Sequence, residues 1–230
     1  MKKGLLILLF LPMITFGQTA KDYFYKAYNA SEEEPQYKID NYTKCLRIAT
    51  NYASAYNNRG VVYKDLGNYK DAIADYSKAI TIDLNYAEPY GNRGNAYYDL
   101  GNYTNAIADF TSAIKIDPDD ADTYYNRGNV YYTQKNYNDA IADYSRAIKI
   151  DPDDHNAYYN RGIAYDELRN YNNAIIDYTR AIRIDPNYAS AYNNRAIAKQ
   201  NAGLSYCSDY KIACDLGKEK CCEWYYKDCR

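Results

Sequence analysis

The feature that most constrains this chain is a repeat of 34 residues. The same short sequence around an arginine returns at each step, at Arg59, Arg93, Arg127, Arg161 and Arg195. A fixed period of this length is typical of arrays in which one supersecondary unit stacks on its own copies. The period predicts one continuous solenoid. In such an array, a function based on binding at an open surface is expected before one based on an enclosed catalytic centre.

Each unit has the pattern of a helix pair. In residues 87–120 the first helix carries Arg93 with Tyr97 four residues later, the spacing of neighbours on one helical face. The turn that follows contains Asn102, which suits left-handed or capping geometry. Pro118 is expected to stop the second helix, and Asp120 to cap the first helix of the next unit.

The repeat resembles the tetratricopeptide repeat (TPR) family, strongly over 53–188 and weakly on both flanks. The matching residues in one unit are Tyr90, Gly94, Tyr97, Ala106, Phe110, Ala113 and Pro118. The resemblance implies an all-α fold, a right-handed α-solenoid of stacked antiparallel helix pairs (the TPR superhelix). It also implies a concave groove, lined by the first helices, in which peptides bind. This chain departs from the family pattern by placing arginine where leucine is usual.

The repeat divides the chain into segments. We expect a signal peptide at 1–17, a degenerate TPR-like helix pair at 18–52, four repeats at 53–86, 87–120, 121–154 and 155–188, and a partial repeat with a Cys-rich capping helix at 189–230. Lys2 and Lys3 precede the apolar run Leu5–Phe16, and small Gly17 stands at the expected cleavage site. The alternative is a buried N-terminal helix. The signal predicts an exported protein, periplasmic or secreted, and no later segment has the composition of a transmembrane helix.

An acidic residue accompanies each arginine. Sixteen residues after the arginine of each full unit stand Asp75, Asp109, Asp143 and Asp177. We predict a structural ladder of Arg–Asp pairs that joins the two helices of a unit, completed at the C-terminal end by Arg195 and Asp209. A catalytic role for these charges is disfavoured because they recur in every unit.

Five of the six cysteines lie in the last 24 residues. Two pairs have a spacing of seven, and export makes disulfides the default interpretation. If their helices are antiparallel, the natural pairing is Cys214 with Cys222 and Cys207 with Cys229. Cys221 in place of Cys222, or a zinc site, are alternatives. Cys45 is expected to be a buried free thiol.

The first helices are expected to present tyrosines and asparagines to the groove. The candidate partner-binding residues are Asn58, Lys64, Asn92, Asn95, Tyr98, Tyr125, Asn126, Asn129, Tyr132, Tyr159, Asn160 and Asn194, and Asn57 and Asn193 map to the same face. An asparagine amide both donates and accepts, which suits a peptide main chain. The alternative is that these amides satisfy neighbouring helices. The tyrosines lie outside the core positions and resemble the contacts of antibody paratopes.

No catalytic motif or cofactor signature is found, and the DPDD turns lack the spacing of a calcium loop. The formal net charge of -2 disfavours a nucleic-acid partner. The sequence therefore favours a non-catalytic scaffold, without cofactors, that binds a protein or peptide in the groove. A glycan- or peptidoglycan-binding module is the alternative. The sequence leaves the oligomeric state open.

Overall fold

The computed structural model describes residues 18–229, and this part of the chain is all-helical. Its thirteen helices are α1 (Ala20–Tyr28), α2 (Pro35–Ile48), α3 (Ala53–Asp65), α4 (Tyr69–Ile82), α5 (Ala87–Asp99), α6 (Tyr103–Ile116), α7 (Ala121–Thr133), α8 (Tyr137–Ile150), α9 (His155–Glu167), α10 (Tyr171–Ile184), α11 (Ala189–Asn201), α12 (Cys207–Asp215) and α13 (Glu219–Asp228). The expected signal peptide lies outside the described residues. The predicted fold class is confirmed.

The signals that end the helices act locally. The carboxylates of Asp120 and Asp154 accept backbone N–H groups in the first turns of α7 and α9, as expected. Between the two helices of a unit, Asn102 caps α6, and it has an ordinary negative φ. The left-handed residue is the preceding one, at Gly67, Gly101, Lys135 and Arg169. Of the two geometries expected for Asn102, left-handed or capping, capping is the one that is formed.

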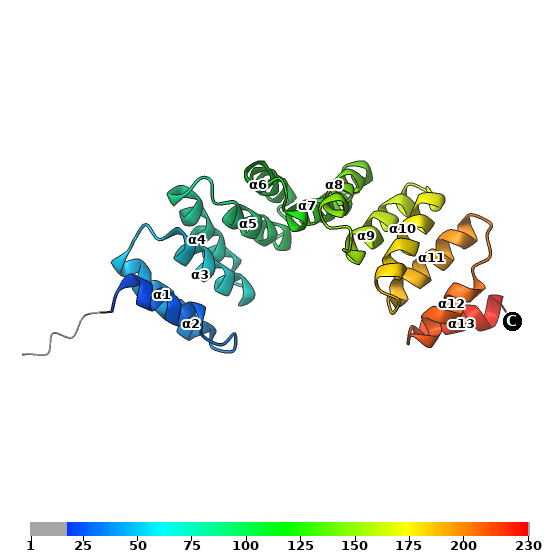
Figure 1. Ribbon diagram of the computed structural model, residues 1–230, viewed down its shortest axis with the longest axis horizontal. Helices are drawn as coiled ribbons and strands as arrows, with labels where there is room; N and C mark the ends of the chain where they lie inside the picture. The colour runs from blue at the N-terminus through cyan, green and yellow to red at the C-terminus, as the bar shows by residue number, and fades with distance from the viewer. Residues whose placement is uncertain (1–17, 230) are drawn as a thin grey trace, which may run out of the picture.

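The helix pairs follow one another along an arch from α1 to α13 (Figure 1). Each helix packs against the next along the chain, and odd-numbered helices also contact each other across units, α3 with α5, α5 with α7, α7 with α9 and α9 with α11. Closer approach between these helices places them on the shorter, inner side of the curve. The inner side is therefore built from the first helices of the units.

The core is a row of small clusters along the array, most of them between the second helix of one unit and the first helix of the next. In the unit 121–154 the ring of Tyr144 packs against Gly128, where an added Cβ would lie 2.8 Å from the ring. Ala140 and Ala164 complete this cluster. Small residues let the helices approach closely, and the aromatic ring fills the space between them. The same contact recurs at Gly60, Gly94 and Gly162.

The two ends depart from the repeat. Phe24 and Tyr42 form the centre of the N-terminal cluster, and α12 has nine residues where the second helices of full units have fourteen. Among the thirteen described helices none combines the length and the apolar composition needed to cross a membrane.

Candidate partner-binding face

Each arginine of the ladder joins three helices. Arg127 donates from Nε to Asp143 Oδ2 at 2.7 Å and from Nη2 to Oδ1 at 2.8 Å, which links α7 to α8. Its Nη1 donates to Thr111 Oγ1, on α6 of the preceding unit, at 2.9 Å. The same three bonds occur at Arg59, Arg93, Arg161 and Arg195.

The contact with the preceding unit was missing from the sequence interpretation. The signal was present, because a serine or threonine stands 16 residues before every arginine, at Thr43, Ser77, Thr111, Ser145 and Thr179. The bidentate pair closes one helix pair, and the hydroxyl contact ties that pair to its neighbour. The ladder is thus both an intra-unit and an inter-unit brace.

The repeated tyrosines around the arginine have a structural role. The Arg127 guanidinium carbon lies 5.8 Å from the ring centre of Tyr124 and 5.9 Å from that of Tyr131. Every arginine of the ladder lies over the tyrosine three residues before it. Such cation–π contacts add to the ion pair in a partly desolvated place. The tyrosines three residues before the arginine are all accounted for in this way, and so are Tyr63 and Tyr131, four residues after it.

The C-terminal pair has an additional cation. Asp209 accepts Arg195 at 2.7 Å and also Lys199 at 2.8 Å. Burial by itself would raise the pKa of Asp209, but the hydrogen bonds and the positive charges of Arg195 and Lys199 together outweigh burial and hold that pKa below its usual value. The shortened last turn therefore keeps the brace intact.

The inner face carries a second network, made of amides and phenols. Between α7 and α9, Asn160 Nδ2 donates to Tyr125 Oη at 2.8 Å and to Asn129 Oδ1 at 3.2 Å. The hydroxyl of Tyr144 donates to the same Asn129 oxygen at 2.8 Å. Two first helices and one second helix are linked here. The side chains predicted to contact a partner are instead bonded to each other at this junction.

The junctions between α3 and α5 and between α9 and α11 have fewer hydrogen bonds of this kind. Asn194 Nδ2 donates to Tyr159 Oη at 3.0 Å, and Asn92 Nδ2 donates to Asn57 Oδ1 at 3.0 Å. Asn57 is fully buried, and Asn193 is 8% exposed, so the expectation that these two side chains are open to the groove is wrong. Asn58 accepts a hydrogen bond from Asn57 at 3.3 Å. For these amides the structural alternative describes the contacts that are made.

Asn95 and Asn126 differ from the other asparagines. Both are partly exposed. Neither side chain has a hydrogen-bond partner within residues 18–229. They lie on α5 and α7, at the centre of the array.

Tyr98 and Tyr132 line a hollow of about 230 Å³ on the inner face, together with Asn129, Tyr144 and Asn160. The Tyr98 hydroxyl lies 3.2 Å from Thr133 Oγ1, and that of Tyr132 donates to Glu167 at 3.4 Å; both contacts are exposed. Burial and the nearby Glu167 carboxylate raise the pKa of Tyr132 to about 12, so it stays a neutral hydrogen-bonding phenol.

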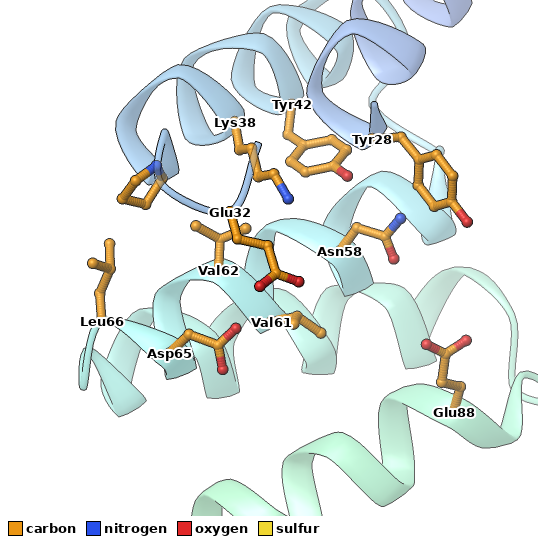
Figure 2. A pocket seen from close by; sticks show the side chains of 11 residues that line it. Tyr28, Glu32, Lys38, Tyr42, Asn58, Val61, Val62, Asp65, Leu66 and Glu88 are labelled. Atoms are coloured by element: carbon orange, nitrogen blue, oxygen red, sulfur yellow. The ribbon is translucent and has the colours of Figure 1, made fainter. Parts of the chain in front are cut away.

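Two further hollows extend this face towards its ends. The N-terminal hollow, of about 620 Å³, is lined by residues of the first two units and by Glu88 of α5 (Figure 2). In it, Glu32 and Lys38 lie opposite Asp65 and Val61 of α3. Lys64 lies beside it and approaches Asp65 to 3.8 Å. A hollow of about 380 Å³ near the C-terminal end includes Asp166 and Ile197.

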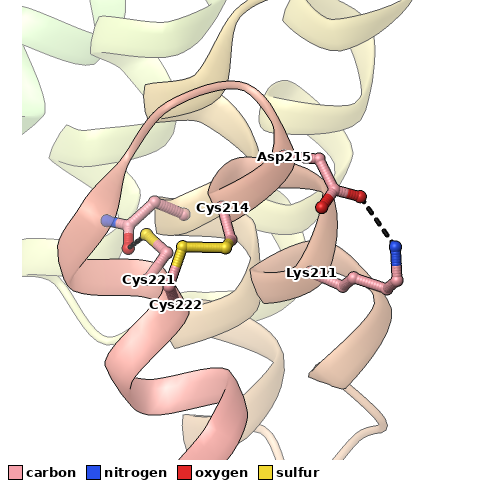
Figure 3. The surroundings of a disulfide bond; sticks show 6 residues. Lys211, Cys214, Asp215, Cys221 and Cys222 are labelled. Carbon is pink, nitrogen blue, oxygen red and sulfur yellow. Dashed lines mark hydrogen bonds and ion pairs between the residues drawn. A yellow bond between two sulfur atoms is a disulfide. The ribbon is translucent and has the colours of Figure 1, made fainter.

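The cysteines of the C-terminal helices lie in the nested arrangement. Cys207 pairs with Cys229, and Cys214 pairs with Cys222 across the α12–α13 turn (Figure 3). Cys221 is a free, buried thiol that donates to Asn193 Oδ1 at 3.0 Å, and Cys45 is also free and buried. The alternative pairing through Cys221 is therefore not the one formed. In the described part of the chain no group of three or more His, Cys, Asp or Glu side chains is placed to hold a metal ion.

Comparisons with known proteins agree with this architecture. The family model "Tetratricopeptide repeat" matches residues 53–86, 121–154 and 155–188, and the model "TPR repeat" matches 94–135. No curated protein matches the sequence.

Among solved structures, MamA is 28% identical with a TM-score of 0.66, over 70% of this chain and 95% of that one. YrrB, described as a TPR protein with an unusual peptide-binding site, is 21% identical with a TM-score of 0.68, over 77% and 92%. A chain of the APC/C hetero-tetramer Cut9–Hcn1 is 15% identical with a TM-score of 0.69, over 92% and 43%. Proteins built in this way are generally non-catalytic scaffolds for protein–protein interaction. The chain described here belongs to the tetratricopeptide repeat family.

Proposed function

We propose that this protein is a non-catalytic scaffold of the cell envelope that binds an extended segment or a helix of a partner protein along the inner face of its arch. The observation that carries the proposal is the row of three hollows along the first helices, of about 620, 230 and 380 Å³. An open row of this kind suits a long ligand better than a small enclosed reactant.

The chemistry of the central hollow supports a peptide. Tyr98 and Tyr132 offer large, rigid rings with a polar tip, and they lose little conformational entropy on binding. The unpaired amides of Asn95 and Asn126 lie on the same two helices, and an amide can match both the donor and the acceptor of a main chain. YrrB, which shares the fold, is described as having a peptide-binding site.

Two features support placement in the envelope. The first residues have the basic and apolar layout of an export signal. The two C-terminal disulfides are bonds of a kind that persists in oxidising compartments. N-terminal sequencing of the protein from the envelope fraction should therefore begin at Gln18. Retention of Met1 on the folded protein would contradict export by this route.

The binding function is tested with a random peptide library displayed against the folded protein. Peptides enriched on the wild type should lose at least about tenfold in affinity for the double variant Tyr98→Ala, Tyr132→Ala, because each ring supplies on the order of 1 kcal/mol or more. Tyr37→Ala is the matched control, since Tyr37 is an exposed tyrosine of α2 and should have no effect.

Unchanged affinity of the double variant would place the binding surface elsewhere. Retention of the protein on purified peptidoglycan, with no peptide enriched, would favour the glycan-binding alternative and contradict the scaffold proposal. Circular dichroism of each variant checks that the helices are intact.

A further inference from the structure

One junction on the inner face lacks groups that the next junction has. Gly91 stands where Tyr125 stands 34 residues later, and Phe110 stands where Tyr144 does. Two phenolic hydroxyls are thereby missing between α5 and α7. As a result, Asn95 and Asn126 have no hydrogen-bond partner among residues 18–229.

The equivalent groups one unit later show what the missing hydroxyls would do. The Tyr125 hydroxyl accepts from Asn160 at 2.8 Å, and the Tyr144 hydroxyl donates to Asn129 at 2.8 Å. Asn126 and Asn95 are the counterparts of Asn160 and Asn129. One amide donor and one amide acceptor, at the positions of a bonded pair one unit later, therefore remain without a partner in the described chain.

There is room beside them. An added Cβ on Gly91 would meet a single atom within 4 Å, Thr123 Oγ1 at 3.7 Å. In the next two units the position is filled by the rings of Tyr125 and Tyr159, which pack 5.8 Å from the rings of Tyr144 and Tyr178. The chain itself thus shows the kind of side chain that fits this place.

We propose that the opening at Gly91 is a subsite for a phenolic side chain of the bound segment, a tyrosine. Its hydroxyl accepts from Asn126 Nδ2 and donates to Asn95 Oδ1, and its ring takes the place that Tyr125 takes one unit later. This inference rests on the proposed function, because it names a side chain of the segment that the groove binds.

The same geometry predicts discrimination against phenylalanine. A ring without a hydroxyl would cover the two amides and leave both unpaired, which is costly in a partly desolvated place. Because Asn95 and Asn126 remain partly exposed, we expect a modest preference, about tenfold, which corresponds to about 1.4 kcal/mol.

The test is an NMR titration of the ¹⁵N-labelled full protein with N-acetyl-tyrosinamide. The side-chain amide signals of Asn126 and Asn95 should shift in a saturable manner, and those of Asn160 and Asn194 should not. N-acetyl-phenylalaninamide should need about tenfold higher concentration. Equal responses to the two probes, or no saturable shift at Asn126 and Asn95, would overturn the subsite.

A filled variant sharpens the test. Gly91→Tyr should abolish the shifts while the helices remain intact, because the new ring bonds to Asn126 from within the chain. Gly91→Ala leaves the opening largely free and should still bind. Asn126→Ala should remove binding without adding bulk, which keeps the test valid if Gly91→Tyr fails to fold. Full binding by a folded Gly91→Tyr variant would contradict the proposal.

Failure of the subsite is distinguishable from failure of the scaffold function. If the affinity of library peptides still depends on Tyr98 and Tyr132 but the tyrosine probe does not bind at Asn126, the scaffold function is supported and the subsite is contradicted. If the affinity of the peptides does not change in the Tyr98 and Tyr132 variants, the library experiment itself contradicts the proposed function.

Discussion

The brace between the helices and the network on the inner face are built from the same 34-residue repeat, yet they behave differently along the array. The Arg–Asp brace has the same bonds in all five units that carry the arginine, with side-chain distances of 2.7–2.9 Å. The inner network is complete between α7 and α9 and open between α5 and α7. One region is uniform and the other varies from unit to unit.

The difference distinguishes the contacts that hold the fold together from those that we propose a partner uses. A column that must hold every unit to the next tolerates no change, so it appears in every copy. Under our proposal, the column that meets the bound segment differs at one place, at Gly91 and Phe110. In a repeat protein, the departures from the repeat are therefore the more informative positions for function.

The largest expected effect is the loss of one brace. Asp143→Ala leaves the Arg127 guanidinium, whose side chain is 16% exposed, without its carboxylate. Breaking a buried pair costs about 3–5 kcal/mol, and urea unfolding should show a loss of this size. Asn138→Ala, an exposed change on the same helix, is the control and should alter stability by less than about 0.5 kcal/mol. A loss below about 1 kcal/mol for Asp143→Ala would contradict the structural role of the ladder.

The next largest effects are expected from two glycine substitutions that change the free energy of unfolding in opposite directions. Gly128→Ala places a Cβ 2.8 Å from the buried Tyr144 ring and should cost about 1–3 kcal/mol. Gly91→Ala meets only Thr123 Oγ1 at 3.7 Å and should gain up to about 1 kcal/mol, because alanine favours the helix. Thermal unfolding of both variants measures the difference. The same sign for both would show that the space at Gly91 is not free.

A hydroxyl comparison tests the inner network. The buried Tyr76 hydroxyl has no hydrogen-bond partner in the described chain, and its neighbouring column holds Val61 in place of asparagine. Tyr76→Phe should therefore be neutral or stabilising, whereas Tyr144→Phe should cost about 1 kcal/mol by leaving Asn129 without that donor. The denaturant concentrations at the unfolding midpoints of the two variants measure this difference in stability. Equal losses would mean that the network at Asn129 contributes nothing of its own.

The smallest effect concerns the turns. Lys135 has φ of 60°, where the two preceding units place Gly67 and Gly101. Lys135→Gly removes an unfavourable left-handed conformation and should raise stability by about 0.5–1 kcal/mol. Gly101→Lys is the reverse exchange and should lower it by a similar amount. A loss of stability in Lys135→Gly would show that the lysine side chain makes a compensating contribution.

Much of the fold is predictable from the sequence, because periodicity reports local structure directly. The tyrosine spacing, the capping aspartates and the stop at Pro118 fix where helices begin and end. The 16-residue separation of Arg93 and Asp109 indicated the brace, since two helices joined by a short turn bring these positions together. The cysteine spacing likewise indicated the nested pairs of α12 and α13.

The inner face was less predictable, because its contacts run between units. Asn92, Asn160 and Asn194 were candidates for binding a partner, and each donates to the unit before it, 35 residues earlier. The position of an asparagine in the repeat shows that it lies on the inner face. It does not show whether its amide is already hydrogen-bonded to a neighbouring unit. That depends on the residue one unit earlier, and only comparison of Gly91 with Tyr125 singles out Asn126.

Hydrogen exchange on the complete protein with a library-selected peptide tests the central claim most directly. We predict that protection gained on peptide binding concentrates in α5, α7 and α9, which supply most of the residues that line the central hollow. Protection confined to α4, α6, α8 and α10, or to the turns of the outer side, would contradict an inner-face partner site.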